Sequence, residues 1–354
     1  MRVEAFTKYS RMAARTRQRL LQYELAFKGA GITLEHHALL DDSYVSNLAT
    51  GQGYSRSAIA RSYFGRIGQI LRSDADVIWI YAELFPYLPG AFERLAARRG
   101  QPIVYDMDDA FFEMYDGSRR SLVRHLLGGK LEPLLSAASA CCCGNAYLQR
   151  YALQFCSNSI VLPTVVDTDC YVPESRGQRP VTLGWIGTPS TWSYVRPLLP
   201  MLRELVDGTS VRFRVVGAGV AAAQDWFAGM DLIEWTEASE INEVQAMDIG
   251  IMPLPDEPWA RGKSGYKLVQ YMACGLPLVA SPVGVNCEIV HDGENGYLVD
   301  SGDHNWKTAL TRLISDGAMR RAFGEAGRRQ AVERYSLAQA APRLIQILRT
   351  VTRK

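Results

Sequence analysis

Two lysines stand four residues apart in GKSGYKLVQYMACGLPLVASPVG, the segment over residues 262–284. The periodicity predicts a helix, on which Lys263 and Lys267 share one face. A helix N-terminus carries a partial positive charge, so cations are unfavourable there unless an anion lies nearby. The pair therefore indicates an anion site, with a solvated loop position for Lys263 as the alternative.

A second candidate anion site lies in GWIGTPST, residues 184–191. A buried strand is expected to end at Gly187, with Thr188, Ser190 and Thr191 at the start of the next helix. Free amides and hydroxyls at such a position suit a phosphate. The alternative is that Ser190 or Thr191 only caps the helix.

Acidic residues follow two other expected strands. Asp106, Asp108 and Asp109 lie close together in YDMDDAFF and repel one another unless a positive group is near. Asp108 and Asp109 are candidates for catalysis, and the alternative is that the three are turn or cap aspartates, or partners of nearby arginines. The acidic spacing also allows a metal site, but no histidine accompanies the acids. Glu83, after VIWIY, is a candidate general base as a free-standing carboxylate, or else a glutamate favoured by a helix N-terminus.

A basic cluster follows the first expected strand, and its members are Arg11, Arg15, Arg17 and Arg19. These side chains suit an anionic acceptor such as a lipid diphosphate, or an anionic membrane surface. A solvated helix face is the alternative. The five histidines show no metal-ligand spacing.

The composition is that of a globular protein with two domains. The chain has 354 residues, of which 47% are hydrophobic and 21% charged, and its net charge of +2 gives no reason to expect nucleic acid as a partner. No apolar run reaches the roughly 18–20 residues of a membrane span. The chain begins on a strand-like segment, so we expect no secretory signal.

The seven cysteines include three in a row and form no paired zinc spacing. We expect them to be small core residues in a reducing compartment, which favours a cytoplasmic protein.

Apolar runs alternate with helix-period segments, which predicts parallel sheets with right-handed crossovers. The expected strands are 3–7, 32–39, 77–81, 102–106, 136–143 and 159–162, then 181–187, 211–217, 232–235, 247–254 and 276–281. We predict domains at 1–165 and 181–335, a linker at 166–180, and a terminal helix at 336–354 that packs back toward the first domain. Ligands in such folds bind beyond the carboxyl ends of the strands.

The segment KLVQYMACGLPLVASPVGVNCEIVHDGENGYLV resembles the nucleotide-binding signature of glycosyltransferase family 4, retaining enzymes of the GT-B fold. VLPTVVDTDCYVP, GWIG and VVGAG extend the resemblance. It implies two Rossmann-like domains facing a cleft, with the nucleotide sugar on the second domain. The residues that it implies for donor binding are Gly187, Thr188, Ser190, Lys263, Lys267, Gln270, Gly284 and Glu288.

The chain departs from the family pattern at two carboxylates. Gly262 and Gln270 stand where the family has glutamates, although Gln270 is able to accept a hydrogen bond from a ribose hydroxyl. Thr188 replaces a usual arginine, which places more of the diphosphate charge on the two lysines. Asp108 stands about where the family often has a histidine, so Asp108 or Asp109 is expected to orient the sugar or the acceptor hydroxyl.

The resemblance implies a retaining glycosyltransferase that moves a sugar from a nucleotide-diphospho-sugar to a glycan or lipid-linked acceptor in surface polysaccharide biosynthesis. We expect no cofactor or metal, a cytoplasmic location at the inner face of the membrane, and Arg11, Arg15 and Arg17 on the acceptor side. The alternatives are a degenerate GT-B protein that binds without catalysis, and a nucleotide-sugar epimerase or hydrolase. The base, the sugar, the acceptor and the oligomeric state do not follow from the sequence.

Overall fold

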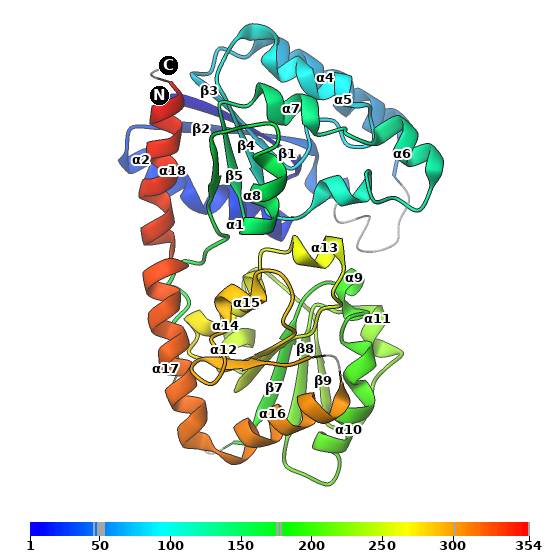
Figure 1. Cartoon of the computed structure of the whole chain (residues 1–354), viewed down its shortest axis with the longest axis vertical. Helices are drawn as coiled ribbons and strands as arrows, with labels where there is room; N and C mark the ends of the chain where they lie inside the picture. Colours follow the sequence, from blue (N-terminus) through cyan, green and yellow to red (C-terminus); the bar gives the residue numbers. More distant parts are fainter. Residues whose placement is uncertain (45–46, 48–53, 175–176, 178, 301, 353–354) are drawn as a thin grey trace. The chain divides into compact units, whose positions relative to one another are not determined.

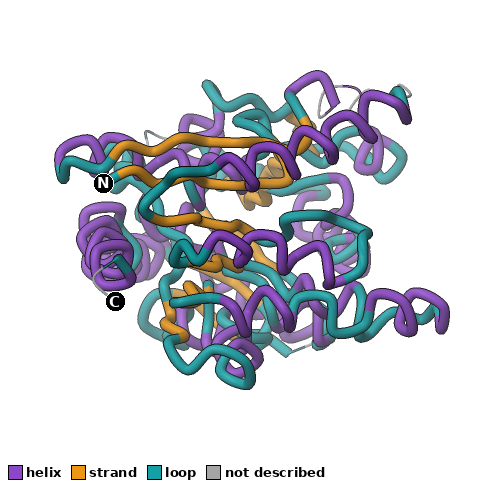
Figure 2. The backbone as a smooth tube through the Cα atoms, turned by 90° about the horizontal axis from the view of Figure 1, so that it is seen from above, coloured by secondary structure: helices purple, strands orange, loops and turns teal. Residues whose placement is uncertain are grey.

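The computed structural model describes the whole chain except residues 45–46, 48–53, 175–176, 178, 301 and 353–354. The chain divides into two compact units. Unit 1 consists of Met1–Thr164, Arg261–Ser264 and Ala340–Lys354, and unit 2 of Val165–Ala260 and Gly265–Gln339. Each unit contains a six-stranded parallel sheet with helices on both faces, as expected for doubly wound domains (Figure 1). In Figure 2 the strands are enclosed between helices.

The sheet of unit 1 has the order β2-β1-β3-β4-β5-β6. Its strands are β1 Arg2–Tyr9, β2 Thr33–Leu40, β3 Val77–Tyr81, β4 Ile103–Met107, β5 Ala140–Cys143 and β6 Ser159–Val161. All five residues of β3 are buried, as are those of β4, because helices cover both faces of a parallel sheet. Cys141, Cys142 and Cys143 form part of the buried β5, and all seven cysteines are free.

The α-helices of unit 1 whose residues the structure describes throughout are α1 Ala14–Arg19, α2 Glu24–Gly29, α4 Arg56–Arg72, α5 Gly90–Glu93, α6 Ser121–Leu127, α7 Glu132–Ala137 and α8 Ala146–Ala152, with most of α18, Leu337–Val351. α4 begins at a regular cap, where the Ser55 hydroxyl accepts from the Ala58 amide.

The sheet of unit 2 has the order β12-β11-β10-β7-β8-β9. Its strands are β7 Thr182–Ile186, β8 Arg212–Val216, β9 Met230–Ile233, β10 Ile249–Met252, β11 Leu278–Ala280 and β12 Gly296–Leu298. Five of them were expected from apolar runs. β12 was not, because it is three residues long and only Gly296 in it is buried.

The helices of unit 2 are α9 Pro189–Trp192, α10 Leu199–Val206, α11 Val220–Ala223, α12 Glu240–Gln245, α13 Pro258–Arg261, α14 Tyr266–Ala273, α15 Asn286–Ile289, α16 Asp303–Ser315 and α17 Gly317–Arg334; the last residue of α13, Arg261, belongs to unit 1. One core joins Trp185 and Phe213 of the sheet to Trp306 of α16. A second core joins Ile186 and Val216, which alternate with them, to helices that include α14. The sheet is thus buried on both faces.

Each sheet reverses its strand order at one point, between β1 and β3 in unit 1 and between β7 and β10 in unit 2. Such a point is where an open α/β sheet binds ligands, beyond the carboxyl ends of its strands. Within the described part of the chain, no helix is long and apolar enough to cross a membrane. Residues 175–176 and 178 of the predicted linker lie outside the described residues.

Candidate active-site residues

Lys267 lies at the carboxyl edge of the unit 2 sheet, beside the central strand β7. It belongs to the first turn of α14, and its Nζ lies 4.3 Å from the centre of the Trp185 ring, a cation–π contact. A Cβ added at Gly187 would lie 2.7 Å from this Nζ and 2.4 Å from the Trp185 ring. Glycine at 187 therefore lets the ammonium group approach the end of β7.

Lys263 does not lie on the same helix face as Lys267, so this expectation is wrong. α14 begins only at Tyr266, after Gly265, whose positive φ of 68° suits glycine and ends the preceding loop. Lys263 belongs to unit 1, where its carbonyl oxygen accepts from Asn145 Nδ2 at 2.9 Å. The alternative of a solvated loop is confirmed for the loop position but not for the solvation, because the Lys263 side chain is 12% exposed.

The GWIGTPST segment forms a capped turn at the end of β7. Thr188 is the N-cap of α9, and Thr191 Oγ1 accepts from the Thr188 amide at 3.2 Å. Thr188 Oγ1 lies 3.0 Å from Ser190 Oγ. Capping is thus present, but the cap is Thr188 rather than Ser190 or Thr191. The hydroxyls of Thr188 and Ser190 remain close to each other at the edge where Gly187 and Lys267 lie.

Two further donor-side candidates follow β11. Gly284 lies in the turn before α15 and has a positive φ of 56°. Glu288 is an exposed residue of α15. Both lie beyond the carboxyl end of β11, which is the edge predicted for the ligand.

Gln270 is buried in a polar network rather than presented at the surface. It is 2% exposed, and its Nε2 donates to Glu240 Oε1 at 2.9 Å and to Tyr171 Oη at 3.1 Å. Tyr171 Oη in turn donates to Glu240 Oε1 at 2.5 Å, and burial raises the pKa of Tyr171. Trp235 Nε1 donates to Glu240 Oε2 at 2.7 Å. Glu240 was missed from the sequence, which shows it only as an acidic residue at the start of a helix.

Gly262 leaves no room for the carboxylate that the family pattern has at its position. A Cβ added there would lie 2.4 Å from Ala110 Cβ and 2.8 Å from the Ala110 amide nitrogen. Real Cβ atoms do not approach backbone so closely, so the contact with Ala110 accounts for the glycine.

Asp108 and Asp109 are held at the carboxyl end of β4. Asp108 Oδ1 accepts from Tyr81 Oη at 2.6 Å. Asp109 forms an ion pair with Arg15 and lies 3.9 Å from Lys263 Nζ. Burial raises the pKa of Asp109, while Arg15 and Lys263 oppose that shift. The two aspartates thus lie among one phenol and two cations, which suits the orientation of a hydroxyl-bearing ligand.

Asp106 has a structural partner. Arg19 Nε donates to Asp106 Oδ1 at 2.5 Å, both side chains are 1% exposed, and Arg19 Nη1 also donates to the Leu162 carbonyl at 2.7 Å. Burial raises the pKa of Asp106 to about 6, which outweighs the attraction of Arg19. The alternative that these aspartates are partners of nearby arginines is confirmed for Asp106 and Asp109.

The basic cluster after β1 divides into different roles. Arg19 is buried, Arg15 pairs with Asp109, and Arg17 Nη1 donates to the backbone carbonyls of Arg11 and Met12. Arg11 is exposed. The solvated helix face is therefore wrong for Arg19, which is buried, whereas the Arg15 side chain is 45% exposed although it pairs with Asp109.

Glu83 is not a free-standing carboxylate, and this expectation is corrected. It is 2% exposed, accepts a short hydrogen bond from Tyr115 Oη, and lies 3.8 Å from Lys130 Nζ. Burial raises its pKa, with Lys130 and Tyr115 opposing. The preceding residue, Ala82, has a positive φ of 65°, which is strained for a residue with a Cβ and turns the chain at the end of β3.

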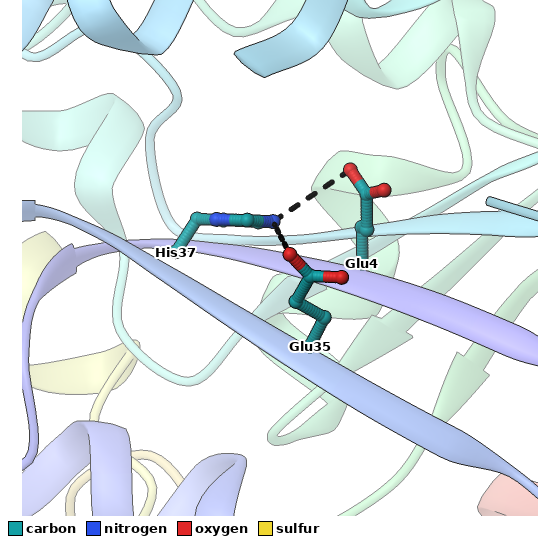
Figure 3. A group of neighbouring side chains, drawn as sticks. All are labelled: Glu4, Glu35 and His37. Atoms are coloured by element: carbon teal, nitrogen blue, oxygen red, sulfur yellow. Dashed lines mark ion pairs between the residues drawn. The ribbon is translucent and has the colours of Figure 1, made fainter. Parts of the chain in front are cut away.

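Within the described residues, one group has the composition of a metal site: Glu4, Glu35 and His37, on β1 and β2 (Figure 3). His37 Nε2 lies 3.4 Å from Glu35 and 3.7 Å from Glu4. Arg2 Nη2, at 2.9 Å from an oxygen of each glutamate, already compensates their charge. Glu4 and Glu35 lie near the amino ends of their strands, away from the edge that collects Asp108 and Asp109.

Comparison with known proteins identifies the domain that carries Gly187 and Lys267. Residues 180–316 match the family model for glycosyl transferases group 1. Most of this matched region lies in unit 2. The resemblance to glycosyltransferase family 4 that the sequence indicated is thereby confirmed.

Curated relatives match parts of the chain. The D-inositol 3-phosphate glycosyltransferase of Corynebacterium urealyticum is 33% identical over 108 residues, which are 30% of this chain and 24% of the relative. A GDP-mannose-dependent alpha-(1-6)-phosphatidylinositol monomannoside mannosyltransferase of Mycolicibacterium smegmatis is 28% identical over 212 residues, which are 53% of this chain and 55% of the relative. The matches thus span from about a quarter to about half of these relatives.

Solved structures match the whole chain in fold. The sucrose-phosphate synthase of Thermosynechococcus elongatus superposes with a TM-score of 0.73 at 13% identity, covering 99% of this chain and 98% of the other. Anabaena Alr3699/HepE, solved in complex with UDP and glucose, gives 0.72 at 14% identity and covers 99% and 100%. The chain has the GT-B fold that the glycosyltransferase signature implied.

Proposed function

We propose that this protein is a retaining glycosyltransferase that transfers a sugar from a nucleotide-diphospho-sugar to a glycan or lipid-linked acceptor, in surface polysaccharide biosynthesis. The observation that carries the proposal is the position of Lys267 beside Gly187, at the carboxyl edge of β7 within the glycosyl transferases group 1 domain. Strand order reverses next to β7, so this is the ligand edge of the unit 2 sheet.

The chemistry of the edge suits a diphosphate. Lys267 supplies a cation held in place by the Trp185 ring, and Thr188 and Ser190 supply hydroxyls at the end of the same strand. A cation fixed before the reaction stabilises the charge that develops on a leaving diphosphate. Similarity to a GDP-mannose-dependent mannosyltransferase and to a protein solved with UDP-glucose supports a nucleotide sugar as the donor. The proposal includes no metal or other cofactor.

Unit 1 provides the acceptor side in this proposal. Asp108 and Asp109 lie beyond β4 with Tyr81, Arg15 and Lys263 around them. A carboxylate in such surroundings orients an acceptor hydroxyl through hydrogen bonds. Arg11 and Arg17 lie after β1 and suit an anionic acceptor. We place the reaction in the cytoplasm, at the inner face of the membrane.

The test begins with donor binding. Thermal shifts are measured with UDP, GDP, ADP and dTDP and their glucose or mannose derivatives, and the preferred donor is titrated calorimetrically into the native protein and Lys267→Ala. Since hydrogen bonds to charged groups contribute about 1.5–3 kcal/mol, the variant is expected to bind roughly 10- to 150-fold more weakly. Lys307→Ala is the matched control, because Lys307 is exposed and pairs with Glu204 on α10. Equal affinity of Lys267→Ala and the native protein would reject the diphosphate site.

Transfer is tested with the donor found in this way. Incubation of protein, donor and membrane glycolipid extract is expected to give a glycosylated product, detected by mass spectrometry, whose new linkage keeps the anomeric configuration of the donor. Turnover of the donor without any acceptor would indicate a hydrolase or epimerase instead.

A second candidate is a GT-B protein that binds the nucleotide without transferring a sugar. Two observations favour it: Gly262 has no room for a side chain, and the Gln270 amide is engaged with Glu240. Tight nucleotide binding without transfer to any extract would support this candidate, and product formation would reject it.

A further inference from the structure

Helix α6 of unit 1 is apolar but only partly packed. Its sequence is SLVRHLL, all seven of its residues are described, and none is buried. Leu122 is 67% exposed and Leu126 is 57% exposed. Isolated helices of this length are not stable in water, and protein helices are normally held by burying an apolar face.

The aliphatic residues of α6 form one face. At about 100° per residue, Leu122, Val123, Leu126 and Leu127 fall within an arc of about 140°. Arg124 and His125 lie outside this arc. The helix is therefore amphipathic, and on its apolar side Leu122 and Leu126 are exposed while Val123 and Leu127 are half-buried.

The charged residues within the segment 117–131 are basic, whereas Asp116 and Glu132 flank it. Residues 117–131 contain no aspartate or glutamate, whereas Arg119, Arg120, Arg124 and His125 are all present and exposed. Arg124 also donates to the Ser118 carbonyl, which ties the start of the segment to the helix.

A hydrogen bond joins the two ends of the segment that carries α6. Asp116 Oδ1 accepts from the Gly129 amide at 2.8 Å, so the chain leaves and returns at nearly the same point. Just before it, the Phe112 and Tyr151 rings stack with centres 3.7 Å apart. We call residues 117–128 the α6 projection; α6 lies at an end of unit 1 in Figure 1.

We propose that the α6 projection docks unit 1 onto an anionic lipid bilayer. The aliphatic arc enters the boundary between headgroups and acyl chains, and the arginines remain at the level of the lipid phosphates. An amphipathic segment with a basic polar side is the arrangement that such surfaces attract. Because the helix is short, docking is reversible and depends on both the leucines and the arginines.

This inference deepens the membrane location given in the proposed function, but it does not depend on transferase activity, since a protein without that activity would bind the same surface. If docking occurs, an acceptor anchored in the bilayer is brought to the protein by diffusion within the membrane. A protein partner for α6 is the competing occupant, and the experiment separates the two.

The experiment is sedimentation of the full chain with vesicles of phosphatidylcholine alone, or of equal parts phosphatidylcholine and phosphatidylglycerol. The native chain is expected to bind the anionic vesicles at least tenfold more tightly than the neutral ones. Leu122→Ser with Leu126→Ser is expected to weaken anionic-vesicle binding at least tenfold. Leu25→Ser is the apolar control, because Leu25 is 82% exposed on α2, outside the projection.

A pair of charge-reversal substitutions tests the contribution of the arginines to vesicle binding. Arg119→Glu with Arg120→Glu is expected to weaken anionic-vesicle binding at least tenfold, since each basic residue near such a surface contributes about fivefold. Arg94→Glu with Arg98→Glu, two exposed residues outside the projection, makes the same change in net charge and is expected to have a much smaller effect.

Insertion is measured directly with a polarity-sensitive fluorophore at Ser121→Cys, in a chain whose exposed Cys170 and Cys287 are replaced by serine. Its emission is expected to shift to the blue with anionic vesicles only. Unchanged emission, or leucine variants that sediment like the native chain, would overturn the proposal. Loss of self-association in the leucine variants without loss of vesicle binding would also overturn it, in favour of a protein partner. Thermal shifts with nucleotides report separately on unit 2.

Discussion

At the scale of single residues, the buried Asp106–Arg19 pair shows how strongly the interior of unit 1 acts on a charge. The pKa of Asp106 rises from 3.8 to about 6, because burial disfavours the charged carboxylate more than Arg19 stabilises it. The folded protein thus binds this proton more tightly than the unfolded chain does. The contribution of Asp106 to the free energy of unfolding therefore falls as the pH rises through this interval, by about 3 kcal/mol in total.

The prediction concerns Asp106→Asn, which removes the titration. The unfolding free energy of the native protein is expected to decline, relative to that of the variant, between the two pKa values of Asp106. Urea unfolding of both proteins over this pH range measures the difference between their unfolding free energies. The contributions of the other carboxylates are common to both proteins and cancel in this difference. A constant difference, or one that grows as the pH rises, would contradict the assignment. Asp106→Asn leaves the Arg19 charge buried without its partner, which costs about 3–5 kcal/mol. The single variant is therefore expected to be less stable than a double variant in which Arg19 and Asp106 are both replaced.

At the scale of elements, the network of Gln270, Glu240 and Tyr171 joins α14, α12 and the segment before β7. Gln270→Glu restores the carboxylate of the family pattern but places it against the buried Glu240. Two adjacent carboxylates do not both ionise without a large cost. The variant is expected to lose about 3–5 kcal/mol of stability at neutral pH, and less at acid pH, where one carboxyl group is protonated.

Urea unfolding of Gln270→Glu at neutral and acid pH measures this effect. Gln270→Met is the matched control, because it keeps the side-chain length and leaves Glu240 bonded to Tyr171 and Trp235. The control is expected to lose about 1–3 kcal/mol for the missing hydrogen bonds, at both pH values. A Gln270→Glu variant as stable as the native protein would contradict the repulsion expected between the side chains at 240 and 270.

The same elements show what the sequence is able to predict. β3 and β4 appear as continuous apolar runs because helices cover both faces, and their predicted bounds agree within a residue or so. β12 is not predicted, because its three residues, two of them half-buried, are too few to show a periodic pattern. The start of α14 was placed too early because the lysine spacing alone does not reveal the turn at Gly265.

The candidate site also contains residues that the sequence predicts and contacts that it does not. Lys267 and Gly187 are found from local patterns, since the strand end and the helix start are both local features. Other features join residues that are far apart in the chain, so no local pattern predicts them. They are the contact of Gly262 with Ala110 and the network around Glu240. Glu83 was misjudged for the same reason, because its partners Tyr115 and Lys130 lie well downstream.

At the scale of the whole molecule, the C-terminal segment belongs to the unit formed by the start of the chain. Residues 340–354 cluster with unit 1, where Arg349 Nη2 donates to the Ala30 carbonyl at 2.7 Å and Arg343 Nη2 donates to the Val161 carbonyl at 2.9 Å. Leu344, Leu348 and Val351 of α18 are buried. Completing unit 1 therefore requires residues that lie far along the chain from its first six strands.

Deletion of residues 340–354 is expected to destabilise unit 1 while leaving unit 2 folded. Each fully buried leucine or valine side chain contributes about 1.5–3 kcal/mol, so the lost segment accounts for much of the stability of a unit this size. Hydrogen exchange measured by mass spectrometry is expected to show faster exchange in β1–β6 and unchanged exchange in β7–β12. Arg343→Ala, which removes one hydrogen bond and keeps the apolar face, is expected to show only a small change near β6. Equal loss of protection in both sheets would mean instead that the two units unfold as one cooperative body.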